Sequence, residues 1–278
     1  DAGETYIPNN ESQNAAVNLA VTAEDCALVH GPPGTGKTYT IARTVRALVE
    51  RGDRVLLSAF TNRAVDNALE ALRDQGFEDI VRVGTENGVR EDMQDLRLEQ
   101  GGDPGERVAE LRGASVVAAT TATCGSRVMR EQEFDVALVD EASQLTEPAT
   151  LAAVNLADRF VLVGDHHQLP PVVRAENDLG ESLFERLVER YPDASVMLER
   201  QYRMSQRIQA FSSREFYDGA LRPADGETAA QRIGDLSGVG GDALPDRLRN
   251  PVSFVDPDGA TVGNTNPAEA ERVREVVK

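Results

Sequence analysis

The sequence has 278 residues, of which 40% are hydrophobic, and it carries a formal net charge of −18. This length is sufficient for one large domain or two smaller domains with buried cores. The sequence lacks the run of about 18 apolar residues that a membrane-spanning helix needs, and its N-terminus lacks the pattern of a signal peptide. We therefore expect a globular, cytoplasmic protein with no membrane partner.

The acidic composition argues at first against a nucleic-acid partner, because binding to a polyanion usually depends on basic side chains that release counterions. Lysine occurs only at Lys37 and Lys278, so nearly all of the 29 basic residues are arginine, against 47 acidic residues. We hypothesise a halophilic protein, since the Debye length falls to about 3 Å at 1 M salt and repulsion between protein and phosphates is then screened. Greater stability in dilute buffer than in molar KCl would contradict this hypothesis.

The cysteine and histidine residues predict no metal centre of their own. Cys26 and Cys124 are too few for a disulfide framework or a four-cysteine site, and we expect two reduced thiols in the core. His166 and His167 are adjacent, so we expect their rings to point apart, and the sequence shows no third ligand beside them. A zinc site is therefore not predicted at these histidines.

Short apolar runs alternate with helical patterns along the first part of the chain. The expected strands are 26–30, 55–59, 80–83, 115–119, 136–139 and 160–163. This alternation predicts a doubly wound α/β fold, in which helices cover both faces of a parallel sheet. Residues 85–113 and 222–250 are poor in large apolar side chains, and we expect them to be surface excursions.

The pattern restarts after Pro171, so we expect a first domain at 1–172, with 85–113 as a short surface insertion, and the beginning of a second domain at 173–278. The expected elements of the second domain are a helix at 182–190, a strand at 195–198, a helix from 205, a strand at 252–255 and a helix capped by Asn266. These strands are too few to complete a second sheet. We therefore expect a truncated second domain and a fragment of a longer protein.

Residues 31–38 match the phosphate-loop pattern G-x-x-x-x-G-K-[ST], between an expected strand and an expected helix. The backbone N–H groups of Gly34, Thr35 and Gly36 can point at phosphate oxygens, and the helix N-terminus adds partial positive charge. Lys37 can then reach the β- and γ-phosphates, and Thr38 can bind Mg²⁺. The segment predicts an ATP site; a plain glycine-rich turn is the alternative.

Two further polar groups follow expected strands at the end of the sheet where ligands bind in open α/β folds. Asp140 is expected to hold Mg²⁺, and Glu141 to orient or deprotonate the attacking water. A solvated strand end is the alternative for such an acidic pair alone. Gln168 is expected to sense the γ-phosphate, and the turn at 170–171 is a candidate hinge towards the second domain.

Motif segments spread over nearly the whole chain resemble superfamily 1B helicases, the group that contains the nonsense-mediated-decay helicase and the Okazaki-fragment nuclease-helicase. These segments are 9–17, the phosphate loop, 58–67, 119–123, 140–143, 164–171 and 201–204. The resemblance implies a RecA-like P-loop NTPase fold followed by an incomplete second RecA-like domain. The later motifs of the family have no counterpart before the chain ends, so we expect this chain alone to have little activity.

The resemblance also implies roles for individual residues. Gln13 would recognise adenine, Tyr202 would stack on it, and Arg203 would reach the γ-phosphate from the second domain. The surface that binds nucleic acid would include Thr61, Asn62, Thr120 and Pro170. Short polar side chains can bond phosphate or sugar without positive charge. Ordinary loop caps and turns are the alternative for these positions.

The implied function is that of an ATP-dependent helicase or translocase that moves 5′ to 3′ on single-stranded nucleic acid. DNA is favoured over RNA because the segment from Thr61 to Asn67 is closer to the Okazaki-type helicases. Two alternatives remain. One is another P-loop ATPase such as a ring-forming remodeller, and the other is an ATP-dependent nucleic-acid clamp without turnover.

Overall fold

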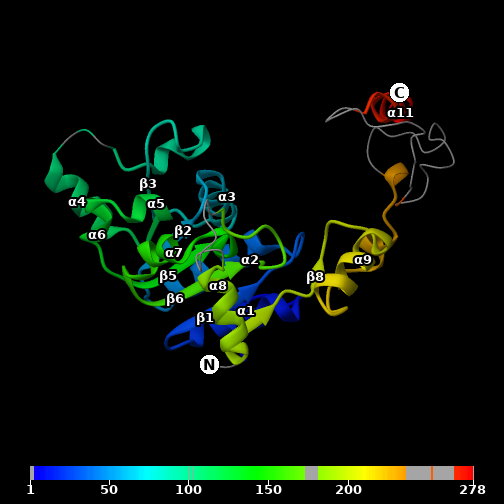
Figure 1. Cartoon of the computed structure of the whole chain (residues 1–278). Helices are drawn as coiled ribbons and strands as arrows, with labels where there is room; N and C mark the ends of the chain where they lie inside the picture. Colours follow the sequence, from blue (N-terminus) through cyan, green and yellow to red (C-terminus); the bar gives the residue numbers. More distant parts are fainter. Residues whose placement is uncertain are drawn as a thin grey trace.

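The structure is a computed structural model that describes residues 3–99, 101, 103–172, 181–235, 252 and 266–277. Within this part of the chain, seven parallel strands form one sheet in the order β3-β4-β2-β5-β6-β1-β7. Their bounds are β1 Cys26–His30, β2 Val55–Ala59, β3 Ile80–Val83, β4 Val116–Thr120, β5 Phe134–Asp140, β6 Ala157–Gly164 and β7 Ser195–Met197. Helices flank the sheet on both faces (Figure 1), so the predicted doubly wound α/β fold is confirmed.

Alternate residues of each strand feed two apolar cores, because successive side chains of a strand point to opposite faces. Leu57 of β2 packs with the core of the first face, whereas its neighbour Leu56 packs on the second. The first face is covered by α1 Glu11–Thr22, α2 Lys37–Glu50 and α3 Asn62–Arg73. The second is covered by α4 Pro104–Gly113, α5 Thr121–Cys124, α6 Arg127–Arg130, α7 Glu147–Val154 and α8 Leu183–Arg190.

The strands β1, β2 and β3 have the predicted bounds, whereas β5 and β6 begin earlier than their apolar patterns indicate. Parallel pairing of Phe134 with Ala157 and of Val136 with Arg159 extends both strands into polar sequence. The guanidinium of Arg159 is paired with the carboxylate of Asp53 at 2.6 Å. Backbone hydrogen bonds between β5 and β6 and the ion pair of Arg159 with Asp53 therefore keep these polar residues in the strands, and hydrophobic periodicity does not identify them.

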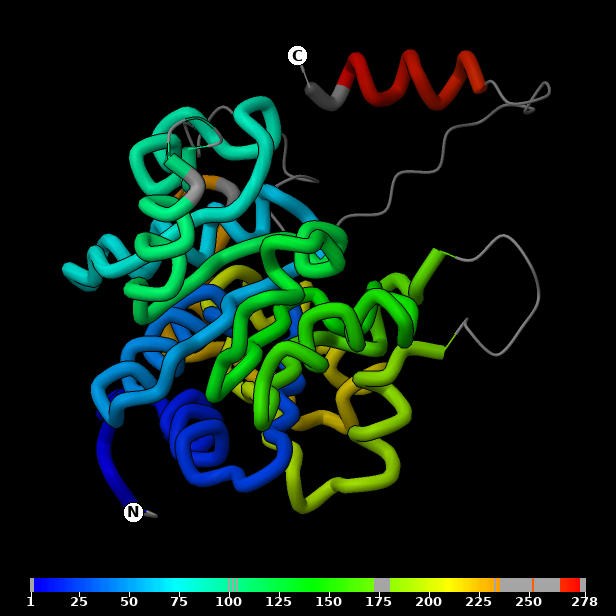
Figure 2. The backbone as a smooth tube through the Cα atoms, turned by 90° about the vertical axis from the view of Figure 1, so that its left-hand side faces the viewer, coloured from blue at the N-terminus to red at the C-terminus, as the bar shows by residue number. Residues whose placement is uncertain are grey.

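The segment between β3 and β4 differs from the surface excursion that we expected at 85–113. It contains a 3-10 helix, η1 Glu91–Leu96, in addition to α4. Val89, Met93 and Leu96 are buried in the first core, so this part of the segment is a packed edge of the domain. Figure 2 shows this segment in teal in the upper part of the view and the N-terminal helix α1 in dark blue in the lower part.

Strand β7 lies beyond residue 172 but pairs with β1 and so extends the first sheet. The chain then forms a separate pair of strands, β8 Arg200–Gln201 and β9 Arg222–Pro223, with the helices α9 Gln206–Phe216 and α10 Gly226–Ala230. The strand expected at 252–255 lies outside the described residues except for Val252. The second domain at 173–278 therefore stays a prediction.

The C-terminal helix α11 Pro267–Val277 begins where the sequence predicts. The backbone N–H of Glu269 donates to the side-chain oxygen of Asn266 at 3.1 Å, which confirms the predicted N-cap. Cys26 and Cys124 are both free, and Cys124 is buried. Among the described helices, none has the length and apolar character needed to cross a membrane.

Candidate active site

The phosphate loop connects the end of β1 to the start of α2 and has a backbone that only glycine tolerates at two positions. Gly34 and Gly36 both have φ of 76°. A Cβ atom on Gly36 would lie 2.6 Å from Nε2 of Gln13, and one on Gly34 would lie 2.7 Å from Cβ of Arg203. The side chains of Gln13 and Arg203 therefore approach the loop so closely that only glycine fits at positions 36 and 34.

Lys37, at the first position of α2, points back over the loop. Its ammonium donates hydrogen bonds to the carbonyl oxygens of Gly31 and Pro32. Burial lowers the pKa of Lys37, although the carboxylates of Asp140 and Asp165 act in the opposite direction. The ammonium thus lies over the mouth of the loop, where phosphate oxygens can replace the two carbonyl acceptors.

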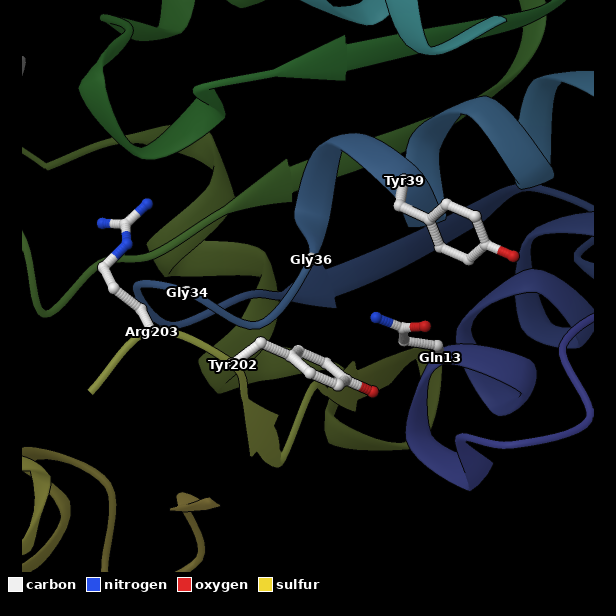
Figure 3. A pocket seen from close by; sticks show the side chains of 6 residues that line it. All are labelled: Gln13, Gly34, Gly36, Tyr39, Tyr202 and Arg203. Carbon is white, nitrogen blue, oxygen red and sulfur yellow. The ribbon is translucent and has the colours of Figure 1, made fainter. Parts of the chain in front are cut away.

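A cavity of about 580 Å³ lies beside the loop and is lined by Gln13, Gly34, Gly36, Tyr39, Tyr202 and Arg203. Figure 3 shows Tyr39 and Gln13 near Gly36 at one end of the cavity and Arg203 near Gly34 at the other. The structure thus brings Gln13, Tyr202 and Arg203 together, as the resemblance implied. Tyr39 was missed by sequence analysis, although its position directly after Thr38 of the loop was an available signal.

Hydrogen bonds fix the walls of this cavity. The Nε2 of Gln13 donates to the carbonyl of Thr35 at 2.9 Å, and the backbone N–H of Tyr202 donates to the carbonyl of Gly34 at 2.8 Å. The Nδ2 of Asn10 donates to the hydroxyl of Tyr202, also at 2.8 Å. Tyr202 is therefore bonded to the N-terminal segment through its hydroxyl and to the loop through its backbone.

The acidic pair lies at the carboxyl end of β5, where the chain makes a sharp turn. Asp140 is buried, and its Oδ1 accepts a hydrogen bond from the backbone N–H of Glu141 at 2.8 Å. Glu141 has φ of 56°, the left-handed conformation that non-glycine residues rarely adopt. Its Oε2 accepts bonds from the backbone N–H and the hydroxyl of Thr61 at 3.1 and 3.0 Å. Thr61 therefore positions the Glu141 carboxylate.

Two smaller cavities join these groups to the phosphate loop. One of about 250 Å³ is lined by Lys37, Thr38, Asp140, Glu141 and Gln168, among others. The other, of about 220 Å³, is lined by Gln168, Arg203 and loop residues from Pro33 to Thr38. Every residue predicted for catalysis, nucleotide binding or the metal ion therefore lines one of three cavities, and neighbouring cavities share lining residues.

Asp165, which follows β6, holds the segment that carries Gln168. Its carboxylate accepts hydrogen bonds from the Nε2 of Gln168 at 2.6 Å and from the hydroxyl of Tyr217 at 2.8 Å. Burial raises the pKa of Asp165, but hydrogen bonds from His30, Gln168 and Tyr217 outweigh it and bring the pKa to about 2. Because Tyr217 follows α9, this ionised carboxylate connects the helices beyond β8 to the site.

The four residues predicted to contact nucleic acid occupy different environments. Thr61 caps α3 and contacts Glu141, and the amide oxygen of Asn62 accepts a bond from Nη2 of the buried Arg82 at 2.7 Å. Thr120 is buried and caps α5, while Pro170 is exposed. The side chains of Thr61, Asn62 and Thr120 thus have structural partners, and a role of the four residues in binding nucleic acid stays a prediction.

The expectation that His166 and His167 point apart is wrong. Their ring centroids lie 4.1 Å apart, and the ring of His30 lies 4.6 Å from His166 and 5.3 Å from His167. Both residues lie in the turn after β6, which folds back over the end of β1 where His30 is located. The ring of His30 is therefore a third imidazole beside His166 and His167. The pairing of β1 with β6 brings it there.

The prediction that Asp140 holds Mg²⁺ implies a dependence of nucleotide binding on pH. Burial raises the pKa of Asp140 to about 6, although the hydrogen bond from Glu141 and the charge of Lys37 lower it. Mg²⁺ requires the ionised carboxylate, so we expect Mg²⁺-dependent affinity for ATP to be complete above this pKa and to be lost as the pH falls through it. We expect the Kd of ATP with Mg²⁺ to rise about tenfold per pH unit below 6.

Binding of a fluorescent ATP analogue between pH 7.5 and 5, with and without Mg²⁺, measures this dependence. Asp140→Asn is the matched control, because ATP itself titrates in this range. The variant should lack the Mg²⁺-dependent gain at every pH. Equal pH dependence in the two proteins would contradict the assignment of Asp140.

Residues 8–103 and 105–176 match a family model described as an AAA domain, and residues 179–278 match a second AAA-domain model. A DNA replication ATP-dependent helicase/nuclease of Arabidopsis thaliana is 38% identical over 229 residues, which cover 79% of this chain and 17% of that protein. An uncharacterized ATP-dependent helicase of Methanocaldococcus jannaschii is 30% identical over 374 residues, covering 99% of this chain and 56% of that protein. The chain belongs to the AAA-domain helicases of superfamily 1.

Among solved structures, this helicase chain is similar to arterivirus nonstructural protein 10, a helicase in complex with DNA. The TM-score is 0.48 and the identity 21%, with 76% of this chain and 44% of that chain covered. The chain spans less than a fifth of the plant helicase and about half of the archaeal helicase. The family and the parallel sheet confirm the RecA-like P-loop fold that the motifs implied.

Proposed function

We propose that this chain is the ATP-hydrolysing core of a helicase that moves 5′ to 3′ along single-stranded DNA. The observation that carries the proposal is the cavity shared by the phosphate loop, Gln168 and Arg203. Arg203 lies beyond β7, the last strand of the first sheet, and yet it faces the loop. An arginine so placed can stabilise charge on the transferring phosphoryl group and link hydrolysis to movement of the chain that carries it.

The larger cavity fits a nucleotide base. The rings of Tyr39 and Tyr202 are each about half exposed and offer stacking faces, and the amide of Gln13 lies close to them (Figure 3). A purine needs both an apolar face and a hydrogen-bonding edge, and this arrangement provides them. We therefore place adenine in the cavity beside Gln13 and the phosphates along the loop towards Arg203.

Mg²⁺ fits the donors that line the cavity next to the loop. Thr38 offers a hydroxyl and Asp140 a carboxylate, and hard oxygen ligands of this kind suit Mg²⁺, which keeps several waters. The ion would neutralise charge on the phosphate oxygens. Glu141, held by Thr61, would accept the proton of the attacking water, and Lys37 would leave its loop carbonyls for the phosphates.

The DNA strand would cross the carboxyl ends of β2 and β4, near Thr61 and Thr120, and the segment after β6 that contains Pro170. Contact with the strand near Thr61 would act on Glu141 through their shared hydrogen bonds, which gives a route from polymer binding to hydrolysis. The choice of DNA is supported by the segment from Thr61 to Asn67 and by the named activity of the plant relative. The 5′-to-3′ direction follows from the resemblance to superfamily 1B.

Removing the Tyr202 ring should weaken nucleotide binding. Stacking of a base on an aromatic side chain contributes about 1–3 kcal/mol, so Tyr202→Ala should raise the Kd of ATP by about 5- to 150-fold. Tyr202→Phe is the matched control, because it keeps the ring and loses only the hydrogen bond from Asn10. Displacement of a fluorescent ATP analogue measures both. If the alanine variant bound ATP like the phenylalanine variant, adenine would not stack on Tyr202.

A further inference from the structure

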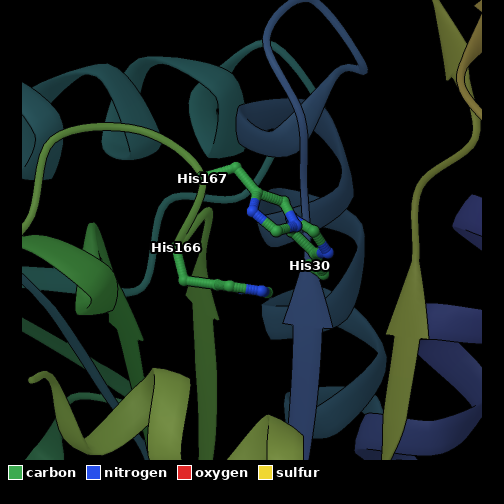
Figure 4. Close-up of side chains that lie close together, drawn as sticks. All are labelled: His30, His166 and His167. Carbon is green, nitrogen blue, oxygen red and sulfur yellow. The ribbon is translucent and has the colours of Figure 1, made fainter. Parts of the chain in front are cut away.

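All three histidines of the chain lie in one cluster. The sequence contains three histidines, and His30, His166 and His167 can each offer one ring nitrogen such that these atoms lie within 4.8 Å of one another. Figure 4 shows the ring of His30 at the end of β1 and the other two rings reaching towards it from the turn after β6. His30 is distant in sequence from His166 and His167. The pairing of β1 with β6 brings them together.

Hydrogen bonding leaves nitrogen atoms in this cluster open to a ligand. The Nε2 of His30 lies 2.9 Å from Oδ1 of Asp165, and a carboxylate oxygen accepts hydrogen bonds, so this contact places a hydrogen on Nε2. In the neutral ring of His30, the lone pair then resides on Nδ1. The Nδ1 of His166 is buried and has no hydrogen-bond partner in the described part of the chain.

A buried ring nitrogen without a partner costs free energy unless something binds it. The contact between Asp165 and His30 is the carboxylate–imidazole arrangement that commonly orients a metal-bound histidine and increases its basicity. An imidazole nitrogen that has no hydrogen-bond partner is a common ligand of transition metals.

We propose that His30, His166 and His167 bind a first-row transition-metal cation, with Zn²⁺ as the reference ion. Three imidazoles suit Zn²⁺, Co²⁺, Ni²⁺ or Cu²⁺, whereas Mg²⁺ prefers oxygen ligands, so this site is distinct from the one at Thr38 and Asp140. The nitrogen atoms, which lie within 4.8 Å of one another, must move closer together to reach Zn–N distances of about 2.0–2.1 Å, and the exposed side chain of His167 has room to turn.

The position of the cluster gives a bound cation a structural consequence. His30 directly precedes Gly31 of the phosphate loop, and His167 directly precedes Gln168, which lines the cavity next to that loop. A cation held by all three histidines would fasten the end of β1 to the turn that carries Gln168. The proposed cation would therefore lie beside the nucleotide site, at residues next to the phosphate loop and next to Gln168, and would not contact the nucleotide.

Zinc titration of the chain, with no histidine affinity tag, tests the proposal directly. Excess Mg²⁺ should be present to saturate the acidic surface, and a chromogenic zinc chelator or the visible absorption of Co²⁺ reports binding. We expect one tightly bound Zn²⁺ per chain. His167→Gln should raise the Kd at least about tenfold, as expected when a ligand or its support is lost. This side chain is exposed, and unchanged thermal unfolding would confirm that the variant folds.

Cys26→Ser is the matched control, because Cys26 is a partly exposed soft ligand outside the cluster, and this variant should bind zinc like the parent. His166→Gln provides a second ligand variant and should weaken binding at least as much as His167→Gln. Absence of stoichiometric zinc binding in excess Mg²⁺ would overturn the proposal. So would equal affinity of the parent and both histidine variants, or loss of binding in Cys26→Ser.

Discussion

Replacing Arg203 by alanine is expected to lower kcat for ATP hydrolysis by about 10³- to 10⁵-fold, the usual effect of removing an arginine that faces the transferring phosphate. The structure holds this residue over the loop in a rigid turn. The buried amide of Gln201 accepts hydrogen bonds from the backbone N–H groups of Arg203 and Met204, at 2.9 and 2.7 Å. The backbone that carries the Arg203 side chain is therefore held in place by Gln201.

Arg203→Lys is the matched control, since it keeps the charge and loses the planar fork that can bond two phosphate oxygens. It should retain more activity than alanine and less than the parent. Steady-state hydrolysis at saturating ATP gives kcat, and the Kd of ATP measured separately should change far less than kcat. Loss of ATP binding in proportion to kcat would instead make Arg203 a ground-state contact only.

Replacing Glu141 by glutamine should lower kcat by about 10²- to 10⁴-fold while ATP binding is retained. The amide has nearly the same shape but cannot accept the proton of the attacking water. The contacts with Thr61 fix where the carboxylate lies, so the defect should reflect lost basicity rather than lost geometry. Single-turnover hydrolysis and binding of a fluorescent ATP analogue separate the two steps.

Glu133→Gln makes the same change of charge just before the opposite end of β5, where the side chain is exposed. This control should hydrolyse ATP like the parent protein. A Glu141→Gln variant that turned over at the control's rate would remove Glu141 from the chemistry and leave another base to be found.

The sheet core and the phosphate site could be predicted because short-range sequence determines them. Strands buried on both faces are read from short apolar runs, so the bounds of β1 and β2 agree with the expectation. The phosphate loop is a local motif whose glycines set its own backbone. Its place between a strand and a helix followed from the same pattern.

Apart from the meeting of Gln13, Tyr202 and Arg203, which the family resemblance implied, features that depend on contacts distant in sequence were not predicted. The joining of β7 to β1, the contact of Thr61 with Glu141 and the meeting of His30 with His166 and His167 all follow from strand order. Periodicity carries no information about which strands become neighbours.

Arg82 is a further example of this limit. It is fully buried in β3, where its guanidinium pairs with Asp66 at 2.9 Å and bonds the amide oxygen of Asn62. A pattern of apolar residues gives no reason to bury a charged side chain. Partners from α3 make the burial possible, because they satisfy the donors of the guanidinium.

The most direct test of the proposed function is ATP hydrolysis in molar KCl, with this chain in its full natural protein, with and without single-stranded DNA or RNA. Glu141→Gln serves as the control. We expect strong stimulation by single-stranded DNA, weaker stimulation by RNA, and neither in the control. Hydrolysis that neither polymer changes would contradict a nucleic-acid motor and indicate a P-loop ATPase of another kind. Tight ATP-dependent binding of DNA without turnover would likewise contradict it and indicate a clamp.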